Sequence, residues 1–166
     1  MKKIFLMLVL LIGTFALVTG CGNEESKVRE DRINNKVVKA TIDKEGNIVI
    51  KKENISETAT FISYNIDGVT ISFIVVRGTD GKVRVAFNTC QSCSPSPKAY
   101  FIQKGDYFEC QNCGNKFHVD KIGEQKGGCN PAPVEEKIED DETIKIPTDY
   151  AKTFKENFRS WDGPKI

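Results

Sequence analysis

Short runs of β-branched and aromatic residues, broken by turn residues, fill the chain from Lys36 onward. "KVVKATI" and "IVIK" flank the turn residues "DKEGN". "TATFISYNI", "VTISFIVVRG" and "KVRVAFN" are separated by the turn signals Asp67-Gly68 and Asp80-Gly81. Runs of this length bounded by Gly, Asn and Asp are typical of strands joined by hairpins. The pattern therefore predicts a β meander.

A further hairpin and one helix complete the predicted fold. "KAYFIQ" and "YFEC" flank "KGD", and "NKFHVD" follows the second strand. "GGCNPAP" has the composition of a loop, and the acidic run "EEKIEDDE" that of a solvated edge. Near the end, aromatic side chains recur at helical spacing behind Thr148, which suits an N-cap: Tyr150, Phe154, Phe158 and Trp161. We expect a mostly β fold, an antiparallel sandwich or meander with a C-terminal helix.

The chain opens with an export signal. Lys2 and Lys3 precede an apolar run that is too short to span a bilayer comfortably but suits a signal peptide. The end of this run, "LVTGC", resembles the bacterial lipobox, which implies that Cys21 is diacylated and becomes the new N-terminus. The alternative is an uncleaved anchor helix. Either arrangement places the body outside the cytoplasm, lipid-anchored or otherwise held at the cell membrane.

These features divide the chain into three parts. Residues 1–20 form the signal peptide, and residues 21–35 form a lipidated N-terminus with a charged tether, "GNEESKVREDRINN". Residues 36–166 form one domain, a length that allows a real core. The net charge of +1 gives no basic excess, which argues against nucleic acid as a partner. No catalytic triad, phosphate-binding loop or pair of catalytic carboxylates is recognisable, so a non-enzymatic role is favoured.

Four of the six cysteines form two pairs of the same spacing. Cys90 and Cys93 are followed, after sixteen residues, by Cys110 and Cys113. Two tight turns that each offer two thiolates can complete a tetrahedron around one ion, and this spacing is typical of four-cysteine sites. The spacing predicts a metal and does not choose between zinc, Cu(I) and an iron-sulfur cluster.

Two other uses of these cysteines stay open. Exported cysteines are commonly paired as disulfides, and one C-x-x-C pair alone can perform thiol-disulfide exchange. An odd number of cysteines in the body argues against disulfides throughout. Redox pairs of the thioredoxin type lie at the start of a helix. Here prolines follow the first pair and Gly114 follows the second, so neither pair is expected to begin a helix. Metal binding is therefore the leading hypothesis.

The residues around the second pair resemble a cluster-binding segment of Rieske proteins. "CQNCGNKFHVD…GGCNPAP" is similar to the Rieske pattern C-x-x-H-G-x-x-F, followed by a glycine-proline loop that covers the cluster. Cys113 stands at the Rieske histidine, and Gly114 and Phe117 are in matching places. The first segment has Cys90-Gln-Ser-Cys93 where Rieske proteins have C-x-H. The resemblance implies a Rieske-like β fold in which cysteines replace the two histidine ligands.

A wider resemblance covers nearly the whole domain. "GKVRVAFNTCQSC", "KAYFIQKGDYFECQNCGNKF" and "IGEQKGGCNPAPV" are similar to the FtrD-like membrane iron-sulfur family, long a domain of unknown function. Its signature is the two C-x-x-C pairs and the GGCNP segment. Some members accompany an iron permease and a copper protein in ferrous-iron uptake, and those members carry several membrane helices before the domain. This chain has a lipobox in that place.

Together these observations predict an extracytoplasmic lipoprotein that binds an iron-sulfur cluster through Cys90, Cys93, Cys110 and Cys113. Its expected role is electron transfer with a membrane redox or metal-transport protein, linked to iron uptake. A zinc or Cu(I) binding module and a thiol-disulfide exchange protein are the alternatives. The Rieske comparison would place Cys129 over the centre, as a further ligand, a redox thiol or a buried inert thiol.

His118 is the only histidine in the sequence. Four cysteines already fill a tetrahedral shell, and adjacent residues on a strand point to opposite faces. We therefore expect His118 not to be a ligand.

Overall fold

The computed structural model of the protein describes residues 36–166. The predicted signal peptide, Cys21 and the charged tether lie outside the described residues. The strands are β1 (Lys36–Lys39), β2 (Thr41–Ile42), β3 (Asn47–Lys51), β4 (Thr60–Ile66), β5 (Val69–Arg77), β6 (Val83–Cys90), β7 (Phe101–Lys104), β8 (Tyr107–Cys110), β9 (Lys116–His118), β10 (Pro131–Pro133), β11 (Ile138–Glu139) and β12 (Thr143–Pro147). The helical segments are α2 (Thr148–Thr153) and the 3-10 turns η1 (Lys52–Asn54), η2 (Val119–Lys121) and η3 (Lys155–Phe158).

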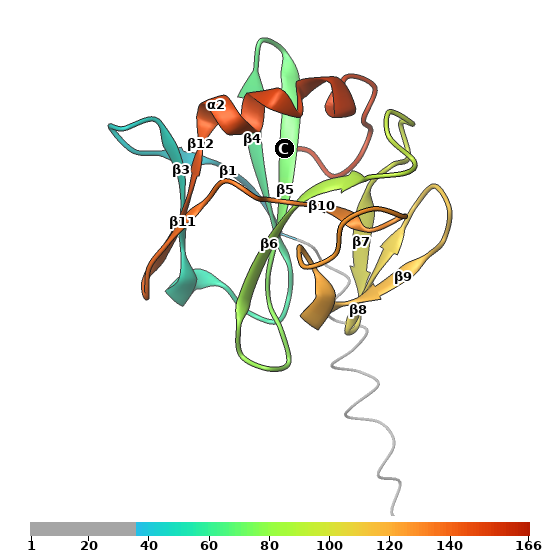
Figure 1. The fold of residues 1–166 in the computed structure, drawn as a ribbon, viewed down its shortest axis with the longest axis horizontal. Helices are drawn as coiled ribbons and strands as arrows, with labels where there is room; N and C mark the ends of the chain where they lie inside the picture. The colour runs from blue at the N-terminus through green and yellow to red at the C-terminus, as the bar shows by residue number, and fades with distance from the viewer. Residues whose placement is uncertain (1–35) are drawn as a thin grey trace, which may run out of the picture.

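These strands form three sheets that lie beside one another (Figure 1). The central sheet has the order β1-β4-β5-β6-β10, and its middle is the predicted meander, with antiparallel β4, β5 and β6. A second sheet has the order β11-β12-β3-β2, and a third has the order β7-β8-β9. The hairpins β2-β3 and β7-β8 also occur where the sequence predicted them. The prediction of a mostly β domain with one C-terminal helix is confirmed.

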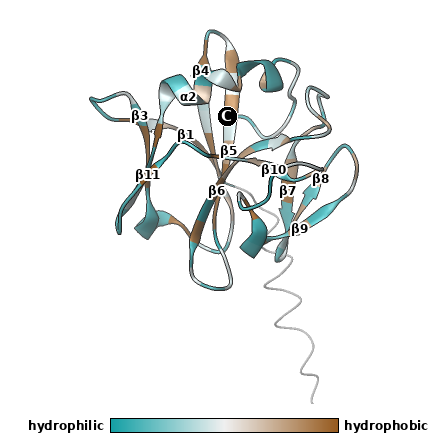
Figure 2. Cartoon of the chain, viewed as in Figure 1, coloured by the Kyte–Doolittle hydropathy of each residue, from teal (hydrophilic) through white to brown (hydrophobic). Residues whose placement is uncertain are grey.

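The central sheet is buried on both faces, and β5 shows why. Successive residues of a strand point to opposite faces, so alternate side chains of β5 enter different cores. Phe73 and Val75 contribute to one core, whereas Ile74 and Val76 contribute to the other, and all four are 0% exposed. This explains why "ISFIVV" is apolar without alternation. Figure 2 shows apolar residues on the central strands and polar ones in the loops.

The two cores differ in what covers the sheet. The first core packs the central sheet against β3, β12 and the C-terminal helical segment, with residues such as Ile48, Ile146 and Phe158. The second core packs the opposite face against β7, β8 and η2, and it includes Phe101 and Phe108. Cys90 and Cys110 also belong to this second core, which places the cysteine pairs at its edge.

The C-terminal helix is shorter than the aromatic spacing predicted. α2 ends at Thr153, and η3 follows it as a 3-10 turn. The N–H of Phe154 donates to the carbonyl of Ala151, three residues back, so the segment tightens there. The expectation that Thr148 caps the helix is wrong, because Thr148 is its first residue and the N-cap is Pro147, which has no side-chain acceptor.

The aromatic face of this segment still packs on the sheet, as predicted. Phe87 of β6 stacks on Phe154 with ring centroids 3.8 Å apart, and Phe158 and Tyr150 also lie near the Phe87 ring. The indole N–H of Trp161 donates to the carbonyl of Asn88 at 2.8 Å.

Some strands and strand pairings were not predicted. β1 pairs in parallel with β4 rather than joining β3, and "PAP" forms β10 on β6 within the expected loop. β11 lies in the acidic run, where Ile138 is 60% exposed, in keeping with a solvated edge.

Candidate metal centre

The two C-x-x-C pairs occupy two turns of the same construction. Cys90 is the last residue of β6, and Cys110 is the last residue of β8. In the first turn the N–H of Ser94 donates to the Cys90 carbonyl at 3.0 Å. In the second turn the N–H of Gly114 donates to the Cys110 carbonyl at 2.8 Å, and Gly114 has the positive φ of 75° that favours glycine. As predicted, both pairs lie at strand ends, and neither opens a helix.

The two turns are joined directly. The hydroxyl of Ser96 donates to the side-chain oxygen of Asn112 at 2.8 Å. The backbone N–H of Gln111 donates to the carbonyl of Tyr100 at 2.8 Å, which ties the second turn to the segment after the first. These bonds bring cysteines that are distant in sequence to one place.

A third segment brings Cys129 to the same place. β10 pairs with β6 so that Pro131 lies opposite Cys90, two residues beyond Cys129. The Cys90 thiol donates to the Cys129 carbonyl, with 3.5 Å between sulfur and oxygen. The pairing register of β10 therefore fixes the distance between Cys129 and the first pair.

Four sulfur atoms form a compact group. The Sγ atoms of Cys90, Cys93, Cys113 and Cys129 all lie within 4.8 Å of one another, and we call them the four-sulfur group. The Cys110 sulfur lies 4.0 Å from that of Cys93. The structure thus brings the four predicted ligands close to one another, and it places Cys129 rather than Cys110 in the four-sulfur group. The predicted ligand set stays a prediction.

The five thiols differ in how deeply they are buried. Cys90 and Cys110 are 0% exposed, Cys93 and Cys129 are half-buried, and Cys113 is exposed. Burial raises the pKa of the Cys90 thiol, and it raises that of Cys110 to about 11. The inner thiols therefore hold their protons more tightly than free cysteine does.

The exposed thiol behaves in the opposite way. Burial acts to raise the pKa of Cys113, but hydrogen bonds from the Asn115 N–H and from neighbouring thiols outweigh it, so this pKa is lowered. The pKa of Cys129 is raised, first because its thiol donates to Cys113 and second because of burial. Among Cys90, Cys110, Cys113 and Cys129, the exposed Cys113 is therefore the thiol whose ionised form is favoured relative to free cysteine.

The residues present fit a thiolate-bound metal centre. The donors are all sulfurs, the soft ligands that suit zinc, Cu(I) and iron-sulfur clusters. All five described cysteines are free thiols in the structure. The site combines two buried thiols, those of Cys90 and Cys110, with the exposed thiol of Cys113.

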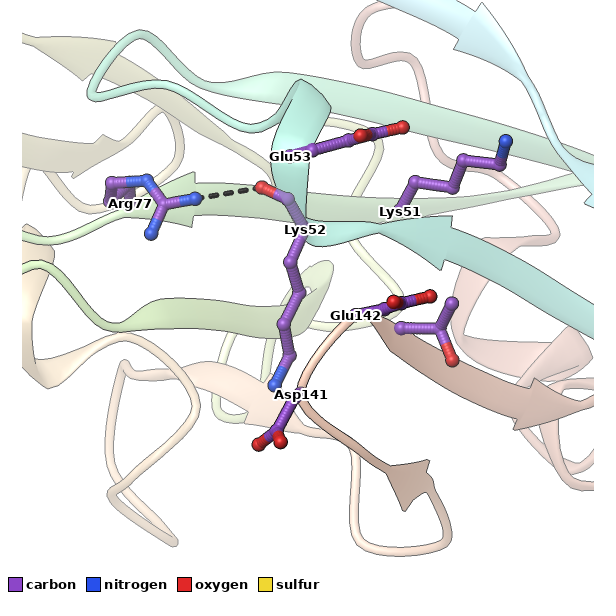
Figure 3. A pocket seen from close by; sticks show the side chains of 7 residues that line it. Lys51, Lys52, Glu53, Arg77, Asp141 and Glu142 are labelled. Carbon is purple, nitrogen blue, oxygen red and sulfur yellow. Dashed lines mark hydrogen bonds between the residues drawn. The ribbon is translucent and has the colours of Figure 1, made fainter.

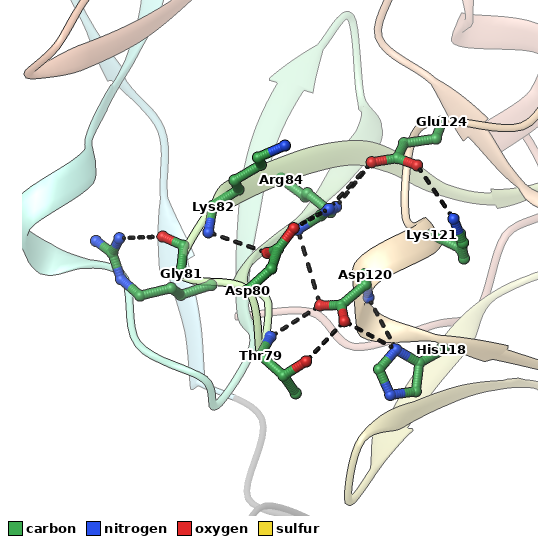
Figure 4. Close-up of polar contacts among 10 residues, drawn as sticks. Thr79, Asp80, Gly81, Lys82, Arg84, His118, Asp120, Lys121 and Glu124 are labelled. Carbon is green, nitrogen blue, oxygen red and sulfur yellow. Dashed lines mark hydrogen bonds and ion pairs between the residues drawn. The ribbon is translucent and has the colours of Figure 1, made fainter.

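His118 lies in a separate polar network that Figure 4 shows. Its Nδ1 accepts from the backbone N–H of Asp120 at 3.3 Å, and it is not part of the four-sulfur group. Asp120 also accepts from the hydroxyl of Thr79 at 2.6 Å. Arg84, only 7% exposed, pairs with Asp80 at 2.7 Å and lies 3.8 Å from Asp120. The network joins the β5–β6 turn to η2, ahead of the Cys129 loop.

A polar pocket lies away from the cysteines, between η1 and the start of β12 (Figure 3). It is lined by Lys51, Lys52, Glu53, Arg77, Asp141, Glu142 and Thr143. The Arg77 guanidinium donates to the Lys52 carbonyl at 2.7 Å, and the Lys52 ammonium pairs with Glu139 at 2.8 Å. These cations are engaged within the fold, so the cysteine cluster remains the candidate site.

One residue that contacts the site was not predicted from the sequence. Gln91, inside the first pair, contacts the Cys129 loop through its side chain. The only signal was the repetition of glutamine after the first cysteine of both pairs, which does not reveal a contact with a third segment.

Among residues 36–166, no helix has the length and the run of apolar residues needed to cross a membrane. Curated proteins gave no match to this sequence. A family model, described as "Membrane iron-sulfur containing protein FtrD-like", matches residues 54–158, which is more than half of the chain and includes all five cysteines of the domain. The match agrees with the clustered thiolates and with the GGCNP segment that brings Cys129 to them. The chain therefore belongs to the FtrD-like family of membrane iron-sulfur proteins.

Proposed function

We propose that this domain holds an iron-sulfur centre outside the cytoplasm, at the cell membrane, and that it passes single electrons to or from a membrane protein. The observation that carries the proposal is the gathering of five thiols, the four-sulfur group and Cys110, in a chain whose residues 54–158 match an iron-sulfur family. When bound, an iron-sulfur centre supplies a site that accepts and returns one electron. The ligands we propose are Cys90, Cys93 and Cys113, with Cys110 or Cys129 in the fourth position.

The protein's own groups would set the properties of this site. Cys90 and Cys110 are buried in the second core, which keeps water from the inner side. The backbone N–H of Cys93 donates to the Cys90 sulfur at 3.4 Å, and such bonds stabilise negative charge on a thiolate. All-thiolate ligation gives a more negative potential than histidine-containing Rieske sites have.

Cys113 is the ligand nearest to a docking partner in this proposal, because its side chain is exposed. Loops surrounding it are rich in uncharged polar residues and glycine, as in "CQNCGN" and "KGGCN". Lipidation of Cys21 would hold the domain close to a membrane redox or metal-transport protein. The family description supports a membrane setting, and we propose iron uptake as the process served.

A single-ion site is the second candidate, and one distance favours it. A tetrahedral ion with metal–sulfur bonds of about 2.3 Å holds its sulfurs about 3.8 Å apart. A group whose members all lie within 4.8 Å is close to that size. A cluster would need the thiolates to spread apart, because they bind different irons. Zinc or Cu(I) in this site would make the domain a structural or metal-capture module.

Anaerobic purification separates these functions. Iron and acid-labile sulfide in equal amounts, with visible absorption that dithionite bleaches, would support the cluster. One equivalent of zinc without sulfide, in protein from iron-replete cells, would support the single-ion module. Mass spectrometry that finds Cys90–Cys93 and Cys110–Cys113 disulfides without metal would contradict both, and it would favour thiol-disulfide exchange.

A further inference from the structure

The side chain of Gln91 connects the first cysteine pair to the loop that carries Cys129. Its Oε1 accepts from the backbone N–H of Gly127 at 2.7 Å. Its Nε2 lies within 3.2–3.4 Å of three carbonyl oxygens, those of Gln125, Asn130 and Pro131. One side chain thus contacts the backbone on both sides of Cys129.

Near Cys129 the loop has two further bonds to the first cysteine pair: the Gln91 N–H donates to the Asn130 carbonyl at 3.1 Å, and the Cys90 thiol donates to the Cys129 carbonyl at 3.5 Å. Both bonds are made at or after Cys129. Gly127 and Gly128 have positive φ values of 78° and 63°, a region that glycine enters freely but does not prefer by itself. Asn130 closes the loop on itself by donating from Nδ2 to the Gly127 carbonyl at 2.7 Å. That bond shapes the loop without attaching it to the cysteine pairs.

The corresponding glutamine of the second pair makes no such contact. Gln111 follows Cys110 just as Gln91 follows Cys90, but its Nε2 donates to the carbonyl of Glu109, in the preceding strand β8, at 2.9 Å. The two pairs are alike in sequence, "CQSC" and "CQNC", and they differ in what the glutamine binds. Gln111 is therefore a matched control for Gln91.

We infer that Gln91 is a positioning residue that holds Cys129 in the four-sulfur group and so keeps a fifth thiolate within reach of the metal. Without this side chain the loop loses its bonds ahead of Cys129, at Gln125 and Gly127, and we expect Cys129 to leave the four-sulfur group. The positioning of the loop stands on the hydrogen bonds alone. The consequence for metal binding rests on the proposed metal centre.

Amide hydrogen exchange of the protein as isolated anaerobically tests the positioning. Gln91→Ala should speed exchange in the segment 125–130 by about tenfold or more, because it removes the acceptor of the Gly127 N–H and loosens the loop. Gln111→Ala should leave this segment unchanged. Gln91→Glu keeps the acceptor and loses the donors, so it should fall between wild type and Gln91→Ala. Equal exchange in wild type and Gln91→Ala would overturn the inference.

Thiol labelling gives a second readout on the same proteins. Iodoacetamide should modify Cys129 several-fold faster in Gln91→Ala than in wild type, with the rate at Cys93 little changed. Equal acceleration at both cysteines would show general loosening and would contradict a specific positioning role. If Gln91→Ala does not fold, as judged by its thermal midpoint, the comparison of Gln91→Glu with wild type decides whether Gln91 positions the loop.

Metal retention tests the consequence. Cys110→Ser should retain metal because Cys129 completes the shell, whereas Cys110→Ser combined with Gln91→Ala should lose it. Equal retention in these two variants would overturn the link between Gln91 and the metal. If no variant, nor the wild type, bound metal, the proposed function would fail, while exchange and labelling would still decide the positioning role.

Discussion

Changing Cys110 and Cys129 to serine, singly and together, should reveal that these two thiols serve one ligand position. The structure places Cys110 4.0 Å from Cys93 on one side of the site, and Cys129 within 4.8 Å of Cys90, Cys93 and Cys113. When either is removed, the other sulfur is near enough to complete the shell. Loss of both leaves only three thiolates.

The expected magnitude follows from the number of ligands. Structural zinc sites contribute about 10–16 kcal/mol, so one of four equal thiolates accounts for about 2.5–4 kcal/mol. Serine at Cys90, Cys93 or Cys113 should therefore weaken metal binding by about 10²–10³-fold. Serine at Cys110 or Cys129 alone should weaken it by no more than about tenfold, and the double variant should lose about as much as Cys90→Ser.

The assay is anaerobic competition between each variant and a chromophoric chelator for zinc, with iron retained per protein as the parallel measure for a cluster. His118→Ala is the control and should match wild type. If Cys110→Ser alone lost as much metal affinity as Cys90→Ser, the shared ligand position would be refuted, because Cys129 would then not replace Cys110. It would equally be refuted if the double variant bound metal normally.

Three further predictions concern the anchor, the core and the polar network. Cys21→Ala should release the body from the membrane fraction or leave an uncleaved precursor, whereas a wild-type protein that is soluble and unlipidated would contradict lipidation. Phe87→Ala should lower the free energy of unfolding by about 3–5 kcal/mol, since the ring is 0% exposed and stacks on the C-terminal segment. A loss below 1 kcal/mol in a denaturant titration would show that this packing adds little. Hydrogen bonds from Thr79 lower the pKa of Asp120. Its stabilising effect should therefore be present above about pH 4 and be lost as the pH falls through the folded-state pKa. Unfolding at pH 6 and pH 3 should show a smaller decline in Asp120→Asn than in wild type, and equal declines would contradict the role of this carboxylate.

Local sequence was sufficient for the features that short stretches of chain determine. The meander β4-β5-β6 was predictable because its strands are joined by tight turns, at Asp67-Gly68 and Asp80-Gly81. The two cysteine pairs were predictable as a site because each pair places two thiols on one turn. The lipobox at Cys21 and the tether are likewise sequence features, and they stay predictions because they lie outside the described residues.

The tertiary structure decided what depends on pairing between distant segments. The register of β10 on β6 sets Pro131 opposite Cys90, and this places Cys129 among the other sulfurs. No local sequence pattern predicts that register, because "PAP" has the composition of a loop and forms a strand only by pairing with β6. The same holds for Gln91 and Gln111, which are equivalent in sequence and differ only because a third segment passes beside Gln91. The position of Cys129 among the other thiols therefore depends on sheet pairing across about forty residues of chain, an interaction that short-range propensity does not encode.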